Sequence, residues 1–267
     1  MKTLSFISLC LFFLMAGPTS HATDELGHSV VHGNSTITSF RKAKRILEDM
    51  IYHDHRVTFY CGCAFDDRGN IPVCGNYTPK KPTARANRLE WDHVVPAEAF
   101  GQSFPEWRQG DPACVDSRGR LFKGRNCARK ISTEFRHMES DLYNLVPTIG
   151  EINRLKSNHS FGMVPGEPRE FGVCDMEIAD GKVEPGDNFL GDVARTYLYM
   201  DAAYPGHGVI SDKNRQLFEA WDRMDPVDAW ECERSARIEK IQGNENPFVN
   251  RACLEAKSKT ESGTANR

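Results

Sequence analysis

The stretch RLEWDHVVPA occupies residues 88–97 and decides the expected fold. It is typical of a short strand that ends by presenting an acidic residue and a histidine side by side. Residues 141–147 read DLYNLVP, and residues 151–154 read EINR. Residues 141–147 predict a strand or turn that leads into a helix. Residues 151–154 predict the start of a helix that returns polar side chains toward the histidine.

Three side chains in these stretches suit metal-assisted hydrolysis of a phosphodiester. Imidazole titrates close to neutral pH, so His93 can serve as a general base. The carboxylate of Asp92 suits a hard cation, and Asn153 adds a neutral carbonyl ligand. Adjacent strand residues face opposite ways, so Asp92 and His93 share a site only if the strand ends or bends there, and Pro96 favours such an end. Taken singly, each of these residues is more often structural.

The N-terminus has the pattern of a secretory signal peptide. Lys2 precedes an apolar run over residues 4–15, and Ser20-His21-Ala22 offers a small-residue cleavage site. We predict a signal over residues 1–22, with cleavage after Ala22. The apolar run is shorter than the roughly 20 residues of a membrane span. The mature chain is therefore expected in the periplasm or outside the cell, without a membrane anchor.

The cysteine count agrees with export. Cys10 lies in the predicted signal, and an even number of cysteines remains, which favours four disulfides among Cys61, Cys63, Cys74, Cys114, Cys127, Cys174, Cys232 and Cys253. Spacing leaves the pairing open. The alternative is a zinc site at Cys61 and Cys63, but no second close cysteine pair or paired histidine motif accompanies them.

Charge argues against binding of nucleic acid through the field of the whole molecule. The net charge is −3, and loss of Lys2 changes it to −4. A protein that holds nucleic acid by its overall field is basic. Any such contact must therefore rest on a local basic face. The position of Lys80, Lys81 and Arg85, just before the central strand, suits such a contact, and residues 111–127 contain a second basic cluster at Arg118, Arg120, Lys123 and Arg125.

The order of expected elements predicts an α+β domain, with strands early and helices late. Beyond the central stretches we predict one early strand over 56–61. Irregular regions are expected over 66–85 and 111–127, and a variable, Gly-rich stretch over 161–187. Amphipathic or short helices are predicted over 40–52, 133–142, 150–158, 189–200, 213–224 and 232–242. Ser39 and Ser211 are expected as N-caps, and Gly243 as a left-handed helix end. The domain should span residues 23–253, and the polar residues 254–267 should form a disordered tail.

Four motifs resemble those of the bacterial endonuclease I family. They are EWDHVVPA at 90–97, MESDLYNLVP at 138–147, GEIN at 150–153 and WECER at 230–234. The resemblance runs from about Arg41 to Cys253. Members of that family are periplasmic or secreted nucleases that cut DNA, and often RNA, with little sequence preference. The resemblance implies a ββα-metal core, also called the HNH or His-Me finger, wrapped by helices and held by disulfides.

The resemblance also implies roles for individual residues. His93 matches the general base, and Asp92 and Asn153 match the two protein ligands of Mg²⁺. Some relatives have glutamate where this chain has Asp92. The shorter aspartate side chain could move the metal or admit a water, but should not abolish metal binding. Asn144 would brace the loop that holds the histidine, and Glu90 would support the site.

Arg125 is the nearest match to the family's catalytic arginine. Some relatives have one more residue between that arginine and the following cysteine, so the match requires a gap. An arginine here would hold the scissile phosphate through paired hydrogen bonds.

The expected function is a Mg²⁺-dependent, sequence-nonspecific endonuclease that leaves 5′-phosphates. Ca²⁺ and Mn²⁺ are alternative metals, DNA and RNA are the expected substrates through phosphate contacts, and a monomer is expected. Two other interpretations stay open at this point. One is a non-catalytic, disulfide-rich binding protein, and the other is a metal-dependent hydrolase of another phosphoester. A zinc peptidase is disfavoured because no His-Glu-x-x-His sequence occurs.

Overall fold

The computed structural model describes residues 30–166 and 168–264. The predicted signal peptide at 1–22, including Cys10, lies outside the described residues. The described chain from Val31 onward forms one unit. Within it, no helix has the length and apolar character needed to cross a bilayer.

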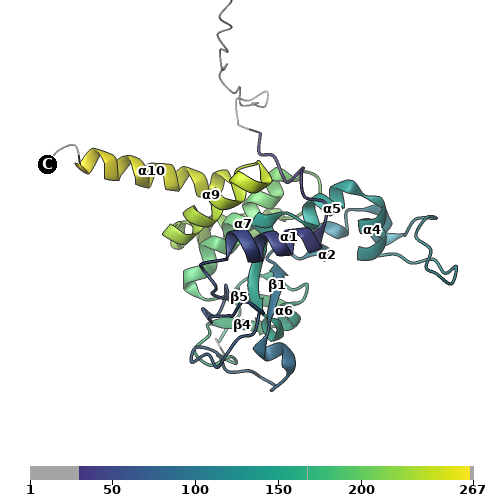
Figure 1. The fold of residues 1–267 in the computed structure, drawn as a ribbon, viewed down its shortest axis with the longest axis horizontal. Coiled ribbons are helices and arrows are strands. Elements are labelled where there is room, and N and C mark those ends of the chain that lie inside the picture. Colours follow the sequence, from purple (N-terminus) through teal and green to yellow (C-terminus); the bar gives the residue numbers. More distant parts are fainter. Residues whose placement is uncertain (1–29, 167, 265–267) are drawn as a thin grey trace, which may run out of the picture. The chain divides into compact units, whose positions relative to one another are not determined.

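The described residues combine helices with two small sheets, which confirms the α+β class (Figure 1). The strands are β1 Leu89–His93, β2 Leu145–Ile149, β3 Ser160–Phe161, β4 Met176–Ala179 and β5 Lys182–Pro185. The α-helices are α1 Phe40–Ile46, α2 Ala97–Gly101, α3 Pro105–Arg108, α4 Arg125–Ile131, α5 Thr133–Glu139, α6 Gly150–Lys156, α7 Leu190–Ala203, α8 Asp212–Met224, α9 Ala229–Gln242 and α10 Pro247–Thr264. Shorter turns are the π-helical η1 Leu47–Ile51 and the 3₁₀ turns η2 Ala84–Asn87, η3 Leu142–Asn144 and η4 Asp187–Phe189.

The central unit is an antiparallel pair of strands followed directly by a helix. β1 and β2 pair in the register Leu89↔Ile149 and His93↔Leu145, and α6 begins at the residue after β2. Every residue of β2 is buried. Two isolated strands are only marginally stable in water, so this pair depends on the elements packed around it.

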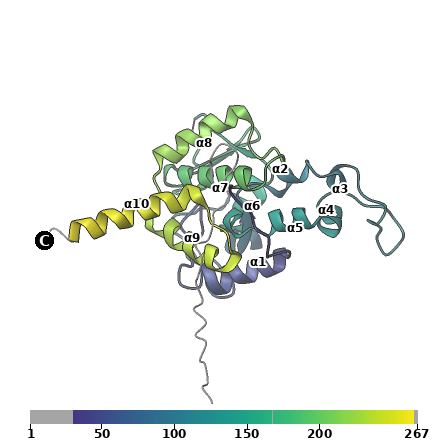
Figure 2. The same cartoon turned by 90° about the horizontal axis from the view of Figure 1, so that it is seen from above.

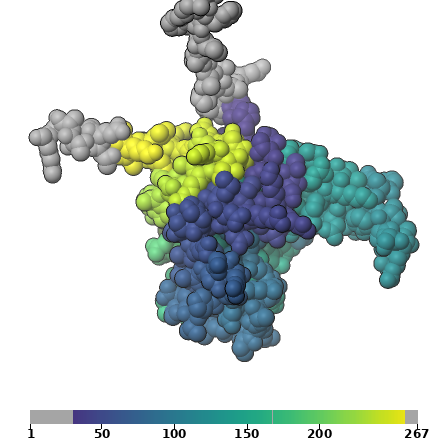
Figure 3. Space-filling view, in the orientation of Figure 1, coloured from purple at the N-terminus to yellow at the C-terminus, as the bar shows by residue number. Residues whose placement is uncertain are grey.

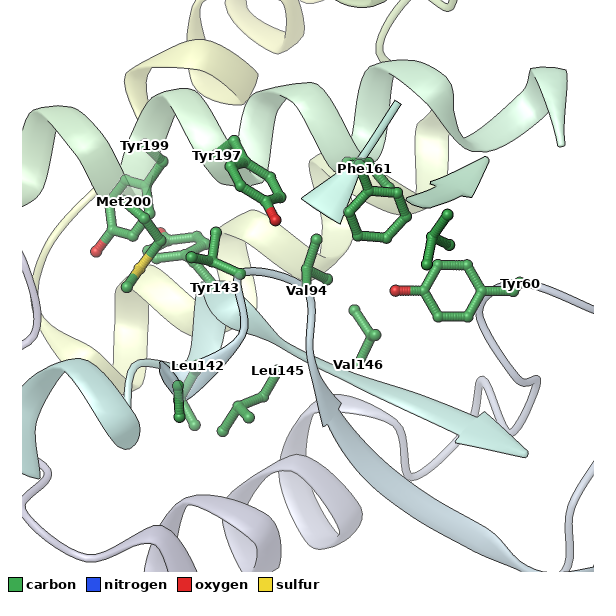
Figure 4. Close-up of a cluster of buried hydrophobic side chains, with 14 of the residues drawn as sticks. Tyr60, Val94, Leu142, Tyr143, Leu145, Val146, Phe161, Tyr197, Tyr199 and Met200 are labelled. Carbon is green, nitrogen blue, oxygen red and sulfur yellow. The ribbon is translucent and has the colours of Figure 1, made fainter. Parts of the chain in front are cut away.

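Those elements form the core around the strands. Figure 4 shows Val94, just after β1, and Val146 of β2 close to Tyr197 of α7 and to Phe161 of β3. α8 packs against α7, and α10 contacts both α9 and α7 (Figure 2). Because Val94 is fully buried, the backbone directly after His93 is held in place by core packing.

The disulfides confirm the interpretation of the cysteines. The pairs are Cys61–Cys174, Cys63–Cys74, Cys114–Cys127 and Cys232–Cys253. Cys61 and Cys63 therefore each bind a different partner, which excludes the zinc alternative at these two residues.

Several predicted helix ends are confirmed. The Ser39 and Ser211 side chains accept hydrogen bonds from main-chain nitrogens of the first turns of α1 and α8. Gly243 ends α9 at φ 88°, a left-handed conformation that glycine adopts without strain. Local hydrogen bonding decides these positions, which is why the sequence predicts them well.

The predicted strand over residues 56–61 is wrong. The chain reverses at Gly62, with φ 63°, and only a single bridge joins Val57 to Ala64. The amide of Thr58 donates to the oxygen of Cys63, which closes the turn at 2.8 Å. β-branched and aromatic residues favour an extended backbone, but here the chain turns back at Gly62, and the one bond from the Phe59 amide to the oxygen of Pro147 in β2 does not extend into a strand.

Two other predictions need correction. Residues 161–187 were expected as a variable, Gly-rich stretch with no named element, but β4 and β5 form a hairpin there across Asp180 and Gly181, both at positive φ. Residues 254–264 were expected in a disordered tail, but they belong to α10, which Cys253 joins to α9. Ala, Leu, Glu and Lys favour the continuation of a helix that is already anchored. Residues 265–267 lie outside the described chain.

Candidate active site

A cleft of about 540 Å³ lies beside β1. Its lining includes the predicted site residues Glu90, Asp92 and His93 from β1, Arg125 from the start of α4 and Asn153 from α6. The fold thus brings together five of the six residues singled out in the sequence for a site. The sixth, Asn144, lies behind the cleft wall.

His93 stands at the last position of β1 and is 6% exposed. Its Nε2 lies 2.9 Å from the main-chain oxygen of Glu139, so the neutral ring donates there and leaves Nδ1 as the nitrogen that can accept a proton. Burial, together with the positive charge of Arg125, lowers the pKa of His93 to about 3. The imidazole is therefore neutral at pH 7, as a general base requires.

Asn144 holds the chain immediately after the histidine. Its Oδ1 accepts from the amide of Val95 at 2.7 Å, and its Nδ2 donates to the oxygen of Val95 at 3.0 Å. The amide of Val94 also donates to the main-chain oxygen of Asn144. All three residues are buried, so these bonds satisfy backbone groups that water cannot reach.

Arg125 reaches the cleft as the first residue of α4. Its Nε donates to Oε1 of Glu139 at 2.5 Å, and its guanidinium lies 5.4 Å from the ring centre of Phe40. Its Nη2 is buried and has no hydrogen-bond partner among the described residues. A buried charged donor without a partner is costly, so this nitrogen is suited to an anion that enters the cleft.

Glu139 is a residue that the sequence analysis missed, although it lies in a quoted motif. It is 1% exposed, and its carboxylate accepts from Arg129 as well as from Arg125. Burial alone would raise the pKa of Glu139, but the two arginines outweigh burial and lower it. Because its main-chain oxygen holds His93, Glu139 positions both side chains at once.

The two predicted metal ligands, Asp92 and Asn153, are not hydrogen-bonded to each other, and each has other partners. Asn153 donates to Oε2 of Glu90 at 2.9 Å, and Glu90 is also held by Arg85 and Arg88. Asn153 thus keeps its amide oxygen for another partner, beside a carboxylate.

Asp92 instead forms a buried ion pair. Its Oδ1 lies 3.2 Å from Nζ of Lys156, and the hydroxyl of Tyr60 donates to its Oδ2 at 3.2 Å. Burial raises the pKa of Asp92, and Lys156 and Tyr60 partly oppose that rise. Lys156 also donates to the oxygen of His93 at 2.8 Å. Lys156 is a second residue that the sequence analysis missed, because its burial depends entirely on the tertiary fold.

The cleft offers oxygen donors whose chemistry suits a divalent cation. They are two carboxylates and an amide carbonyl, which is the oxygen chemistry that Mg²⁺ or Ca²⁺ requires. Across the described ranges, no group of three His, Cys, Asp or Glu side chains has the arrangement of a metal site. Mg²⁺ commonly uses only one or two carboxylates together with waters and substrate phosphates, so the set fits a weakly held ion.

Comparisons with known proteins agree with the motifs. The sequence model of the family described as Endonuclease I matches residues 35–253. An extracellular deoxyribonuclease of Aeromonas hydrophila is 43% identical over 80% of this chain and 90% of its own length. A periplasmic deoxyribonuclease of the same organism is 41% identical over 80% of this chain and 86% of its own. Endonuclease-1 of Buchnera aphidicola subsp. Acyrthosiphon pisum is 38% identical over 82% of this chain and 83% of its own length.

Proposed function

Because the chain belongs to the endonuclease I family, we propose that it is an exported endonuclease that hydrolyses DNA phosphodiesters without sequence preference. The observation that carries the chemistry is the cleft in which the neutral His93 and the guanidinium of Arg125 are both held by Glu139. A proton acceptor and a phosphate-binding cation in one cleft are the groups that phosphodiester hydrolysis needs.

In the proposed reaction, His93 takes a proton from water at Nδ1 while that water attacks phosphorus in line with the departing 3′ oxygen. The imidazole is oriented for this by the bond from Nε2 to Glu139. Attack breaks the bond between phosphorus and the 3′ oxygen, which takes a proton from a second water and leaves as a 3′-hydroxyl, while the other fragment keeps a 5′-phosphate. Arg125 would bind the scissile phosphate through its unpartnered Nη2 and offset the charge that develops there.

The proposed cofactor is one Mg²⁺ ion, with Ca²⁺ or Mn²⁺ as alternatives. Asp92 and Asn153 would hold it, which requires an Asp92 oxygen to leave its contact with Lys156 or Tyr60, and Glu90 lies beside Asn153 as structural support. When bound, such an ion would stabilise negative charge on the phosphate and on the leaving oxygen. The order β1, β2 and α6 around these ligands supports the assignment of a ββα-metal core.

The remaining parts of the proposal concern substrate and location. RNA is included as a substrate because contacts to phosphates do not read the sequence. Export to the periplasm or the medium is supported by the predicted signal and by the names of the relatives. One cleft serves one cut, so a monomer is sufficient.

Digestion of supercoiled plasmid by the mature chain tests the function. Wild-type protein should nick and then degrade the plasmid with Mg²⁺ and leave it intact with EDTA. His93→Ala should lose at least about 100-fold in rate, since general-base catalysis contributes about that much. The matched control is His53→Ala, because His53 is exposed and does not line the cleft.

Three other outcomes would each reject part of the proposal. If plasmid and RNA stay intact with Mg²⁺, Mn²⁺ and Ca²⁺, the chain is a binding protein. Cleavage of small phosphoesters but not of polymers would indicate another hydrolase. Full activity in His93→Ala, at unchanged thermal stability, would remove His93 as the base.

A further inference from the structure

A projecting loop leaves and re-enters the fold at the edge of the cleft. We call residues 108–124 the basic arm. The amide of Gly124 donates to the oxygen of Trp107 at 3.0 Å, which closes the base of the arm. Trp107 and the next residue after the arm, Arg125, both line the cleft. Figure 2 shows this segment extending away from α3 and α4, and Figure 3 shows the teal part of the chain projecting at the right of the molecule.

The basic arm has a defined conformation. Val115 and Leu121 form a bridge between its two legs, and the amide of Phe122 donates to the oxygen of Cys114 at 2.9 Å. The Cys114–Cys127 disulfide fastens one leg to α4. Gly119, at φ 75°, forms the turn at the tip. The backbone of the arm is therefore held in one conformation, which lowers the entropic cost of binding.

The charge of the arm differs in sign from that of the whole chain. It carries four basic and two acidic residues, whereas the chain has a net charge of −3. Asp116 is already paired with Arg120, and the Asp111 side chain accepts from the amide of Ala113. Arg118 and Lys123 are exposed, and no ion pair is recorded for either within the described chain. These two cations are left to meet an external anion.

We propose that the basic arm binds the phosphate backbone of the same DNA duplex whose scissile phosphate lies in the cleft. The proposal rests on the proposed nuclease function. A leg of about six extended residues spans roughly 20 Å, or about six base pairs of B-DNA. The arm would thus contact phosphates to one side of the cut and favour long polymers over short fragments. Backbone contacts of this kind add affinity without reading sequence.

The test compares two substrates and three double variants. Arg118→Gln/Lys123→Gln removes both cations. Lys240→Gln/Arg251→Gln removes the same charge from exposed positions on α9 and α10, which lie at the other side of the view in Figure 2. Arg118→Lys/Lys123→Arg keeps the charge. The substrates are a 40-base-pair duplex and bis(p-nitrophenyl) phosphate, a diester too small to reach beyond the cleft.

The arm variant should raise KM for the duplex about 10-fold at 0.15 M salt, with kcat unchanged, and should lower the salt slope by about 2. On the small diester it should match wild type, and the other two variants should match wild type on both substrates. Equal KM and salt slope for the arm variant and the α9/α10 variant would overturn the proposal. Failure of the proposed function is distinct, because wild type would then leave the 40-base-pair duplex uncut, whether or not it cleaves the small diester.

Discussion

Glu139 joins the two halves of the proposed chemistry at the scale of a single residue. Its main-chain oxygen accepts from His93, and its buried carboxylate accepts from Arg125 and Arg129. A main-chain contact survives substitution, whereas the carboxylate contact does not. The two functions of Glu139 can therefore be separated experimentally.

Replacement of Glu139 by glutamine should lower kcat by about 100-fold with a smaller change in KM, because Arg125 loses the carboxylate that aims it. Steady-state cleavage of a fluorescent duplex measures both constants. Glu134→Gln is the control, since Glu134 lies on the same helix and its side chain is 61% exposed. A variant with wild-type kcat would show that Arg125 does not depend on Glu139.

The buried His93 should make the protein less stable in mild acid. Its pKa is 6.5 when unfolded and about 3 when folded, so only the unfolded state takes up this proton between those values. The contribution to the free energy of unfolding is complete above pH 6.5 and falls as pH drops toward 3. Between pH 7 and pH 5 the loss should be about 2 kcal/mol. Urea unfolding in EDTA measures it.

His93→Gln serves as the reference for that measurement, because all other titrating groups are shared by the two proteins. The difference between their free energies of unfolding should change with pH by the stated amount. Parallel pH curves for the two proteins would contradict the burial of a neutral His93.

At the scale of elements, the cleft depends on how β1 meets η3 and β2. The strands pair over five residues each, and the chain after β1 is fastened by Asn144 at the end of η3. The same Asn144 is followed directly by β2. The asparagine therefore couples the end of one strand to the start of the other, where His93 is placed.

Asn144→Ala should destabilise the protein by about 2 to 4 kcal/mol, because it leaves the buried amide and oxygen of Val95 without partners. It should also reduce cleavage, since the backbone after His93 is then less constrained. Chemical denaturation and plasmid cleavage report the two effects. Asn158→Ala, at an exposed position of the cleft rim, should change stability by less than about 0.5 kcal/mol. Equal stability of the two variants would show that Asn144 does not hold the backbone that follows His93.

At the scale of the whole described chain, one disulfide encloses the cleft. Cys61 and Cys174 are 113 residues apart, and β1, α4, α5, β2 and α6 all lie between them. By contrast, Cys232 and Cys253 are 21 residues apart and join two late helices. The two bonds should therefore differ in their effect on stability.

Loss of the Cys61–Cys174 disulfide should lower the free energy of unfolding more than loss of the Cys232–Cys253 disulfide. In the chain-entropy account, Cys61→Ala/Cys174→Ala lowers the free energy of unfolding by about 4 to 5 kcal/mol, and Cys232→Ala/Cys253→Ala by about 3 kcal/mol. Guanidinium unfolding of both variants measures the difference. The reverse order would show that native packing, not loop closure, dominates. Activity should fall on reduction of the wild-type protein for the same reason.

Local interactions explain what could be predicted of the site. The helix at Asn153 and the helix ends at Ser39 and Gly243 rest on contacts within a few residues. The strand at His93 is predicted from its local pattern, although it pairs with β2, which is distant along the chain. The fold brings five of the six predicted site residues into one cleft. Their catalytic and metal-binding roles stay predictions until measured.

The sequence by itself determined the α+β class, the family and the oxidised state of the cysteines, because pattern, motif and count suffice for these. Only the tertiary structure decided which cysteines pair, that Lys156 binds Asp92, and that Glu139 serves both His93 and Arg125. The physical reason is the separation of the contacting residues along the sequence. These contacts join groups distant along the chain, and their partners are chosen by burial, which no local pattern encodes.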